Sequence, residues 1–148
     1  MQREERDYQH RPHLCGLFPT NWLKERKEML FSESLKKNND FRNVYENGKS
    51  YANKYLVMYV LENNKGVNRL GISASKKVGN SVIRHRFARL VRESYRLHEN
   101  IFNSGLDIVV VARKSAASVR YFEIEHALLQ LSKLHHILKN IDEENQNL

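Results

Sequence analysis

Residues 71–93, GISASKKVGNSVIRHRFARLVRE, are rich in basic side chains, and no other stretch of the sequence points as clearly to a chemical role. Between Gly71 and Arg92 the chain has no Asp or Glu. An Arg guanidinium binds two phosphate oxygens at once, and a Lys ammonium attracts them as a compact charge. Phosphate binding is therefore the predicted chemistry, and the cations that would provide it are Lys76, Lys77, Arg84, Arg86, Arg89 and Arg92.

The hydrophobic spacing of residues 81–98 predicts a helix that carries most of these charges. On a helical wheel the face expected to pack against the protein gathers Ile83, Phe87, Leu90, Val91, Ser94 and Leu97. The far side gathers His85, Arg89, Arg92 and Arg96, and Arg84 and Arg86 flank the apolar face. Asn80 or Ser81 is suited to cap this helix after a loop that contains Gly79.

A row of like charges on one helix side destabilises the helix unless something neutralises it. A phosphate backbone does so and releases counterions, which favours nucleic acid as the partner. A solvated basic face without a partner and an anionic membrane are the alternatives. The membrane is disfavoured because the apolar face of the helix is needed for the core, and we expect no small-molecule substrate.

Aromatic residues on a basic protein bind unpaired bases by stacking, which is typical of single-strand recognition. Phe41 and Tyr45 on a first helix and Tyr59 on the following strand are the candidates. The alternative for each ring is that it fills the core.

The other titratable residues do not form a recognisable catalytic or metal site in the sequence. His135 and His136 lack a Cys or carboxylate array and are expected on the surface. Glu123 and Glu125 do not pair with a Ser-His or Cys-His arrangement, so no protein nuclease centre is evident.

Length and composition predict one soluble cytoplasmic domain. The chain has 148 residues, a net charge of +8 and 41% hydrophobic residues. Residues 1–28, whose charges nearly cancel, contain the only Cys and Trp and both prolines. We interpret them as a disordered leader, upstream of a native start at Met29, rather than a partner-binding arm. The domain is expected at 29–140, followed by a frayed tail at 141–148.

The expected order of elements is α-β-β-α-β-α, a two-layer α+β sandwich. A helix over 34–47 is capped by Ser34 and ended by Gly48, and a strand over 51–62 pairs with an antiparallel return strand over 67–75. The helix over 81–98 follows, and then the apolar run 106–112, which is typical of a central strand. A last helix is expected over 119–139, with Phe122, Leu128, Leu129, Leu131, Leu134, Ile137 and Leu138 as its apolar residues.

Five blocks of this sequence, in order, resemble the protein subunit of bacterial ribonuclease P. The most specific is SKKVGNSVIRHRFARLVRE at 75–93. The others are LKKNNDFRNVYENGKS at 35–50, SYANKYLVMYV at 50–60, RLGISASKK at 69–77 and DIVVVARKSA at 107–116. The resemblance extends from about residue 31 to residue 138 and leaves out residues 1–28.

The resemblance implies a small mixed sheet with about three helices, of the class named after the second domain of ribosomal protein S5. It also implies a left-handed crossover through the basic helix, against the usual right-handed rule. In this family the RNA subunit is the catalyst and holds the Mg²⁺ ions that activate water. The protein assists removal of the 5′ leader from precursor tRNA, which makes the mature tRNA 5′ end.

The resemblance also implies the binding residues. The positions that would face the catalytic RNA are Lys76, Lys77, Asn80, Arg84, His85, Arg86, Arg89, Arg92 and Arg96, and those that would contact the single-stranded leader are Phe41, Tyr45 and Tyr59. Two positions depart from the family pattern, because His85 replaces an Asn and Ala88 replaces a common Lys. A ribosomal RNA-binding protein and a stand-alone nuclease are the competing hypotheses.

Overall fold

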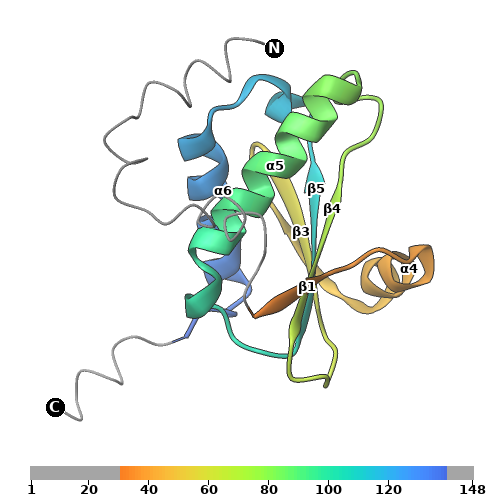
Figure 1. Cartoon of the computed structure of the whole chain (residues 1–148), viewed down its shortest axis with the longest axis vertical. Helices are drawn as coiled ribbons and strands as arrows, with labels where there is room; N and C mark the ends of the chain where they lie inside the picture. Colours follow the sequence, from red (N-terminus) through yellow and green to blue (C-terminus); the bar gives the residue numbers. More distant parts are fainter. Residues whose placement is uncertain (1–30, 140–148) are drawn as a thin grey trace, which may run out of the picture.

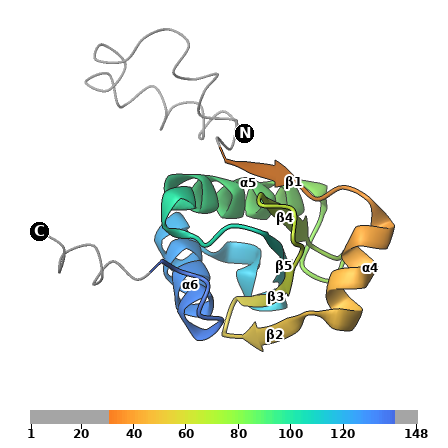
Figure 2. The same cartoon turned by 90° about the horizontal axis from the view of Figure 1, so that it is seen from below.

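The computed structural model describes residues 31–139, so the predicted leader at 1–28 and tail at 141–148 lie outside the described residues. Its elements are β1 (Ser32–Ser34), α4 (Asn38–Asn47), β2 (Lys49–Ala52), β3 (Leu56–Glu62), β4 (Asn68–Ser73), α5 (Ser81–Leu97), β5 (Leu106–Ala112) and α6 (Tyr121–Leu134), with 3₁₀ turns η1 (Glu99–Ile101) and η2 (Lys114–Ser118). The strands form one mixed sheet in the order β1-β4-β5-β3-β2. Helices α5 and α6 cover one face and α4 lies on the other (Figures 1 and 2). The predicted α+β class, with a mixed sheet and three helices, is confirmed.

Strand β5 is the central strand, as its apolar run predicts. It pairs in parallel with β4 and antiparallel with β3, and six of its seven residues are buried. A strand with apolar residues on both faces removes most hydrophobic surface from water when it lies in the middle of the sheet. The predicted hairpin between 51–62 and 67–75 is therefore wrong in its pairing, because β5 lies between β3 and β4.

The connection from β4 through α5 to β5 joins two parallel neighbours. In Figure 2 these strands point away from the viewer, and the chain passes counter-clockwise from β4 through α5 to β5. The crossover is therefore left-handed, as the family resemblance implies. It places the basic helix across the sheet on the side opposite α4.

Two predicted elements near the start of the domain differ in their boundaries. Ser34 does not cap a helix, because it ends β1, which pairs in parallel with β4, and α4 begins four residues later. The predicted strand 51–62 is a hairpin of β2 and β3. Asn53 makes its turn, because the Asn53 side-chain oxygen accepts hydrogen bonds from the backbone N–H groups of Tyr55 and Leu56 at 3.2 and 3.0 Å.

Gly48 ends α4, as predicted, and a close approach explains why it is glycine. A Cβ at this position would lie 2.5 Å from the Val44 carbonyl oxygen, which accepts a hydrogen bond from the Gly48 N–H at 2.9 Å. No larger residue fits without moving the backbone. The glycine thus fixes where the chain leaves α4 for β2.

The main core lies between the sheet and the two long helices and includes Phe87, Val91, Leu128 and Leu131. The predicted buried face of α5 is wrong at its end, because Leu97 is 52% exposed whereas Tyr95 is fully buried. The Tyr95 hydroxyl and the Ser32 hydroxyl of β1 form a hydrogen bond at 2.8 Å. This contact with an edge strand far away in the sequence explains why Tyr95, and not Leu97, faces the core.

The last helix, α6, is shorter than predicted and ends at Leu134. His136 has a positive φ of 56°, which breaks the helix, and Ile137 then returns to the core from a non-helical segment. Phe122 and Leu134, two of the apolar residues named for the predicted helix, are 79% and 45% exposed. Among the helices within residues 31–139, none is both long and apolar enough to cross a lipid bilayer.

Candidate nucleic-acid interface

The loop between β4 and α5 brings Lys76 and Lys77 to the surface beside the start of the helix. Both lysines are exposed, while Val78 anchors the loop in the main core. Asn80 caps α5, as one of the two predicted candidates, because its side-chain oxygen accepts a hydrogen bond from the Ile83 N–H at 3.1 Å. The side chain of Asn80 thus stabilises the start of the helix that carries the arginines.

The outward side of α5 carries His85, Arg89 and Arg92, and all three side chains are exposed. The sequence therefore placed these three residues correctly on the solvent side. His85, one of the two departures from the family pattern, can still present a polar ring to a partner. Ala88, the other, is half-buried and leaves a gap in the row of charges.

The remaining three arginines of α5 are more enclosed. Arg84 and Arg86 are half-buried, as expected for positions that flank the apolar face. Arg96 is also half-buried, and its guanidinium bonds Glu93 at 2.9 Å within the helix. Its charge is thus partly neutralised by an acidic neighbour.

The three candidate aromatic residues meet on the face of the sheet that α4 covers. The ring centres of Tyr45 and Tyr59 are 4.9 Å apart in an edge-to-face arrangement, and those of Phe41 and Tyr45 are 6.4 Å apart. Phe41 and Tyr59 pack against a small core of Leu35, Val44 and Val109, whereas Tyr45 is 38% exposed. The rings therefore share one surface, and two of them also fill a core.

Gly71 of β4 allows the Phe41 ring to pack directly against the strand. A Cβ at Gly71 would be 2.7 Å from the Phe41 ring atom Cε1, which is closer than atoms of real structures approach. The ring therefore occupies the space that a side chain would need. This glycine fixes both the depth of the aromatic surface and the distance of α4 from β4.

An ion-pair network that the sequence reading did not predict holds α4 against the sheet. Arg69 of β4 binds both carboxylate oxygens of Asp107 on β5, with its Nε and Oδ1 2.7 Å apart and its Nη2 and Oδ2 2.5 Å apart. Its Nη1 lies 3.3 Å from a carboxylate oxygen of Asp40, in the first turn of α4. Arg69 thus ties the residue that precedes Phe41 to the central strand.

Asp107 is buried in the central strand, with 1% of its surface exposed. Burial by itself raises the pKa of a carboxyl group, but the hydrogen bonds from Arg69 and Asn63 outweigh this effect and hold the pKa of Asp107 below its usual value. In turn, the hydrogen bond to Asp107 raises the pKa of Arg69 above its ordinary value, although burial opposes it. The pair is therefore charged at neutral pH.

A further group of cations gathers at the end of the sheet where α5 and α6 begin. Lys54 lies in the turn before β3, Arg113 and Lys114 follow β5, and Arg120 caps α6; all four are exposed. Because β4 and β5 are parallel and β3 is antiparallel to them, these positions lie at the same end of the sheet as Lys76 and Lys77. Two basic residues directly after a buried strand were the only sequence signal for this group.

The histidines near the end of the domain have structural contacts. His135, predicted on the surface, is half-buried and stacks edge-to-face on Tyr51, while its Nε2 lies 2.9 Å from the Met58 carbonyl oxygen. Burial lowers the pKa of His135, and nearby Lys49 adds to this, although the bond with Met58 opposes both. Elsewhere, at the end of α5, the His98 Nε2 lies 2.9 Å from a carboxylate oxygen of Glu125 and so connects α5 to α6.

Comparison with known proteins identifies related sequences over most of the domain. The family model "Ribonuclease P" matches residues 29–136. The "Ribonuclease P protein component" of Lachnoclostridium phytofermentans is 63% identical over 109 residues, which cover 74% of this chain and 94% of that protein. The protein of the same name from Alkaliphilus metalliredigens is 52% identical and covers 70% and 93%.

Solved structures show the same fold. The RNase P protein of Staphylococcus aureus is 35% identical with a TM-score of 0.68, over 73% of this chain and 99% of that one. The RNase P protein of Thermotoga maritima is 32% identical with a TM-score of 0.63, over 68% and 96%.

Proposed function

The chain belongs to the ribonuclease P protein family, and from this premise we propose that its basic and aromatic surfaces bind two different RNAs. As a ribonuclease P protein component it is part of an endoribonuclease that processes tRNA. In the proposal the first surface, consisting of α5 and the loop at 74–80, binds the catalytic RNA. The second, the surface of Phe41, Tyr45 and Tyr59, binds the single-stranded leader of precursor tRNA.

The exposed row of His85, Arg89 and Arg92 is the observation that carries the first assignment. The buried side of the same helix belongs to the main core, so the helix is held rigidly and its charges point outward. A folded RNA presents phosphates at a fixed spacing, and a rigid row of cations binds them with little loss of side-chain and backbone freedom.

The second assignment is supported by the position of the aromatic surface on the other side of the sheet from α5 (Figure 2). Tyr45 offers an exposed ring, with Phe41 and Tyr59 beside it. Unpaired bases stack on such rings without regard to sequence. A leader bound there would leave α5 accessible to the catalytic RNA, so both RNAs could be held at once.

We assign the Mg²⁺ chemistry to the RNA subunit. Within residues 31–139 no three His, Cys, Asp or Glu side chains gather in a way that could hold a metal ion. In this proposal the RNA subunit holds the metal ions, and the role of the protein is to bind and orient two RNAs. The proposed compartment is the cytoplasm, where precursor tRNA is made in bacteria.

Reconstitution tests the proposed function. The chain is mixed with the ribonuclease P RNA of the same genome, and cleavage of precursor tRNA is followed over a range of Mg²⁺ concentrations. We expect no cleavage by the chain alone and a lower Mg²⁺ requirement when the RNA and the chain are combined. Precursor tRNA should bind the complex more tightly than mature tRNA, because only the precursor has a leader.

Two results would contradict the proposal. Cleavage by the protein without the RNA would indicate a nuclease centre in the protein itself. Tight binding to ribosomal RNA, without any stimulation of the ribonuclease P RNA at physiological salt, would favour the ribosomal RNA-binding hypothesis.

A further inference from the structure

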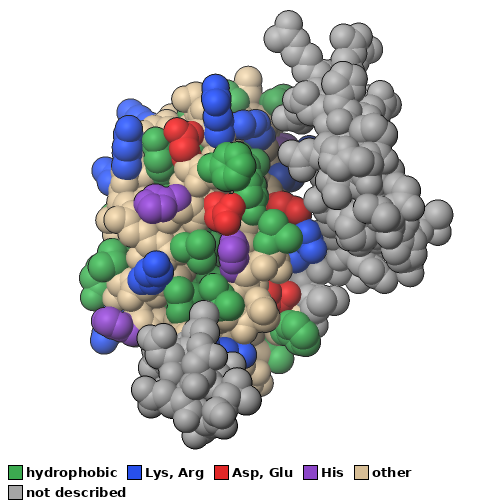
Figure 3. Space-filling view, turned by 90° about the vertical axis from the view of Figure 1, so that its left-hand side faces the viewer, with side chains coloured by type: hydrophobic (Ala, Val, Ile, Leu, Met, Phe, Trp, Pro, Cys, Tyr) green, Lys and Arg blue, Asp and Glu red, His purple; other side chains and the backbone are tan. Residues whose placement is uncertain are grey.

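The two sides of the sheet differ in how their charged side chains are paired. Figure 3 shows the face formed by α5 and α6, where acidic, basic, histidine and hydrophobic side chains lie among one another. On these helices the Arg96 guanidinium bonds Glu93 and the His98 ring bonds Glu125, both at 2.9 Å. An RNA phosphate would have to compete with those carboxylates.

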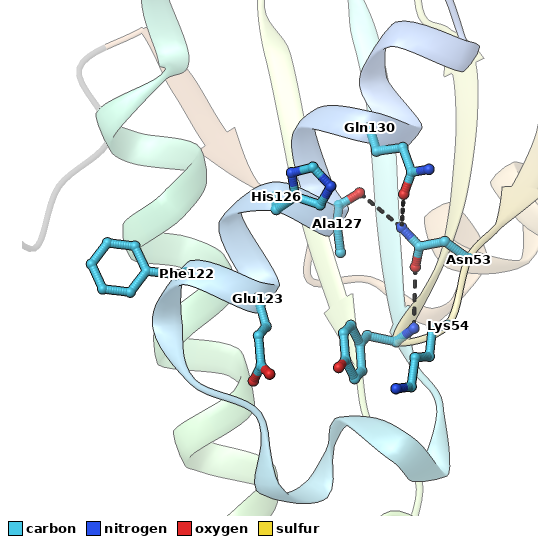
Figure 4. Close-up of a pocket in the computed structure, with 8 residues that line it drawn as sticks. Asn53, Lys54, Phe122, Glu123, His126, Ala127 and Gln130 are labelled. Atoms are coloured by element: carbon cyan, nitrogen blue, oxygen red, sulfur yellow. Dashed lines mark hydrogen bonds between the residues drawn. The ribbon is translucent and has the colours of Figure 1, made fainter.

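A hollow lies between α6 and the turn that joins β2 to β3 (Figure 4). The Asn53 Nδ2 donates hydrogen bonds to the Ala127 carbonyl oxygen and the Gln130 side-chain oxygen, at 3.0 and 3.3 Å. The Phe122 ring lies on the α5 side of α6 and points away from Lys54, so the two do not face one ligand. The contacts around the hollow therefore serve to hold the β2–β3 turn against α6.

On the other side of the sheet, α4 lies along one row of paired strand residues. This row consists of Gly71, Val109 and Tyr59, which pair with one another across β4, β5 and β3. The Phe41 ring packs against Gly71, and the Tyr45 ring lies 4.9 Å from that of Tyr59. The helix thus crosses the strands and leaves a row of residues on each side of it.

The ion pair of Asp40 fixes which side of α4 faces which row. Its carboxylate lies 3.3 Å from the Arg69 Nη1, so this side of the helix faces the row of Arg69 and Asp107. Residues two apart in an α-helix lie about 200° apart around its axis. Arg42 therefore lies on the opposite side of α4 from Asp40 and faces the other neighbouring row.

That other row is the part of the sheet that α4 leaves uncovered, toward the start of α5 (Figure 1). Ser73, Val111 and Val57 pair across it, and all three are partly exposed. Tyr45 lies on the same side of α4 as Arg42, because residues three apart are neighbours on a helix surface. Its ring is 38% exposed. An RNA strand on this row would therefore meet a ring and a guanidinium together.

Arg42 is an exposed cation that no side chain of the domain neutralises. Among residues 31–139 nothing forms a hydrogen bond, ion pair or ring contact with its guanidinium. Asp40 is bound by Arg69, and Glu46, one turn beyond Arg42, is exposed and does not bond it. A guanidinium binds phosphate through two parallel hydrogen bonds. The charge of Arg42 can thus bind a phosphate without competition from a bonded carboxylate, unlike that of Arg96.

We propose that Arg42 binds a phosphate of the 5′ leader, next to a base that stacks on Tyr45. The proposal rests on the proposed function of the aromatic surface and adds a charged residue to it. An exposed ring beside a guanidinium suits a nucleotide, whose base stacks and whose phosphate is negative. The leader is favoured over the catalytic RNA, because α4 and α5 lie on opposite sides of the sheet (Figure 2).

The test measures precursor and mature tRNA binding to the complex of the chain with the ribonuclease P RNA of the same genome. Arg42→Ala and Arg42→Gln should weaken precursor binding about threefold to fivefold at low salt, the upper range for one exposed ion pair, and leave mature tRNA binding unchanged. The slope of log affinity against log salt should fall by about 0.7, as for one phosphate of a single strand. Arg42→Lys should keep the slope, because it keeps the charge.

Lys133→Ala is the matched control. It removes an equally charged, exposed side chain from α6, on the opposite side of the sheet, and should leave precursor binding unchanged. Thermal unfolding of the Arg42 variants should match that of the wild type, because the side chain is exposed and makes no bond within the domain.

Uncharged leader phosphates locate the contact. Precursor tRNAs are prepared in which one leader phosphate at a time is replaced by a neutral methylphosphonate. At one position the wild-type complex should lose affinity while the Arg42→Ala complex loses none, because both changes remove the same contact. Losses that add at every position would contradict a contact between Arg42 and the leader.

The remaining outcomes separate Arg42 from the wider function. If Phe41→Ala reduces the preference for precursor tRNA but the Arg42 variants bind as the wild type does, the phosphate contact is wrong and the leader surface stands. Equal losses for precursor and mature tRNA, or the same loss in Lys133→Ala, would indicate a general effect of charge and overturn the contact. A wild-type complex that binds both tRNAs equally well would overturn the leader surface and Arg42 together.

Discussion

The two proposed RNA-binding surfaces differ in how their side chains are held. His85, Arg89 and Arg92 project from the outer side of α5, and the core beneath them is made by other residues of the helix. Phe41 and Tyr59 instead pack against Leu35, Val44 and Val109, so the same rings serve the fold and the proposed binding site. Substitutions of the outward α5 side chains should therefore change mainly RNA binding, while substitutions of Phe41 or Tyr59 should change stability as well.

The largest effect is expected at Arg69, which ties α4 to the central strand. Arg69→Met leaves the buried Asp107 carboxylate without its main partner, and this should lower the free energy of unfolding by about 3–5 kcal/mol. Urea denaturation at pH 7 measures it. Asp40→Asn is the control: it removes only the longer contact, to a partly exposed carboxylate, and should cost about 1 kcal/mol or less.

The pH dependence of this variant sharpens the prediction. In the wild type the pKa of Asp107 is held low, so its contribution to stability is present above the ordinary carboxyl pKa and is lost as the pH falls below it. Without Arg69, burial dominates and raises that pKa, so protonation on acidification stabilises the folded variant relative to its state at pH 7. The stability difference between the two proteins should shrink from pH 7 toward pH 4. A constant difference would show that Asp107 is not the group left uncompensated.

The next largest effect is expected at Phe41. Phe41→Ala should weaken binding of precursor tRNA by about 1–3 kcal/mol if a base stacks on the ring, and leave binding of mature tRNA nearly unchanged. Filter binding with both tRNAs measures the difference. Phe41→Leu is the control, because it keeps most of the apolar contact and removes the aromatic ring. Equal losses for both tRNAs would place Phe41 in the core and not in the leader site.

The contrast between the surfaces also explains what the sequence could predict. The exposure of His85, Arg89 and Arg92 follows from helical periodicity, which is a local property, and the prediction holds along most of α5. It fails at Tyr95 and Leu97, where contact with β1 decides which side faces inward. The central position of β5 was predictable because an apolar run needs burial on both faces.

Features that join distant segments were not predictable in this way. Arg69 and Asp107 are 38 residues apart, and nothing in either segment indicates the other. The run at 106–112 is apolar except for Asp107. A charge inside a buried strand is acceptable only with a partner from elsewhere, and the run itself does not indicate which residue that is. The hollow beside Phe122 likewise depends on the β2–β3 turn, and the predicted single strand over 51–62 left no turn there.

A smaller effect is expected from single arginines on α5. Arg92→Ala should weaken binding of the catalytic RNA by about 1 kcal/mol and reduce the salt slope by about one ion, as for the loss of one phosphate contact. The unfolding free energy should stay within about 0.5 kcal/mol of the wild type, because the side chain is exposed. Measuring affinity at several salt concentrations tests both parts. The same loss of affinity at every salt concentration would contradict a phosphate contact.

The smallest effect is expected at Arg96, whose guanidinium is bonded to Glu93 at 2.9 Å. An RNA phosphate must compete with that carboxylate for the guanidinium, so Arg96→Ala should change the salt slope by less than Arg92→Ala does. Glu93→Gln provides the complementary test: it removes the competing charge and should strengthen RNA binding, with a steeper salt dependence, by more in the wild type than in Arg96→Ala. If Arg96→Ala and Arg92→Ala have equal effects, the row of charges continues to the end of α5, and pairing within the helix does not limit RNA binding.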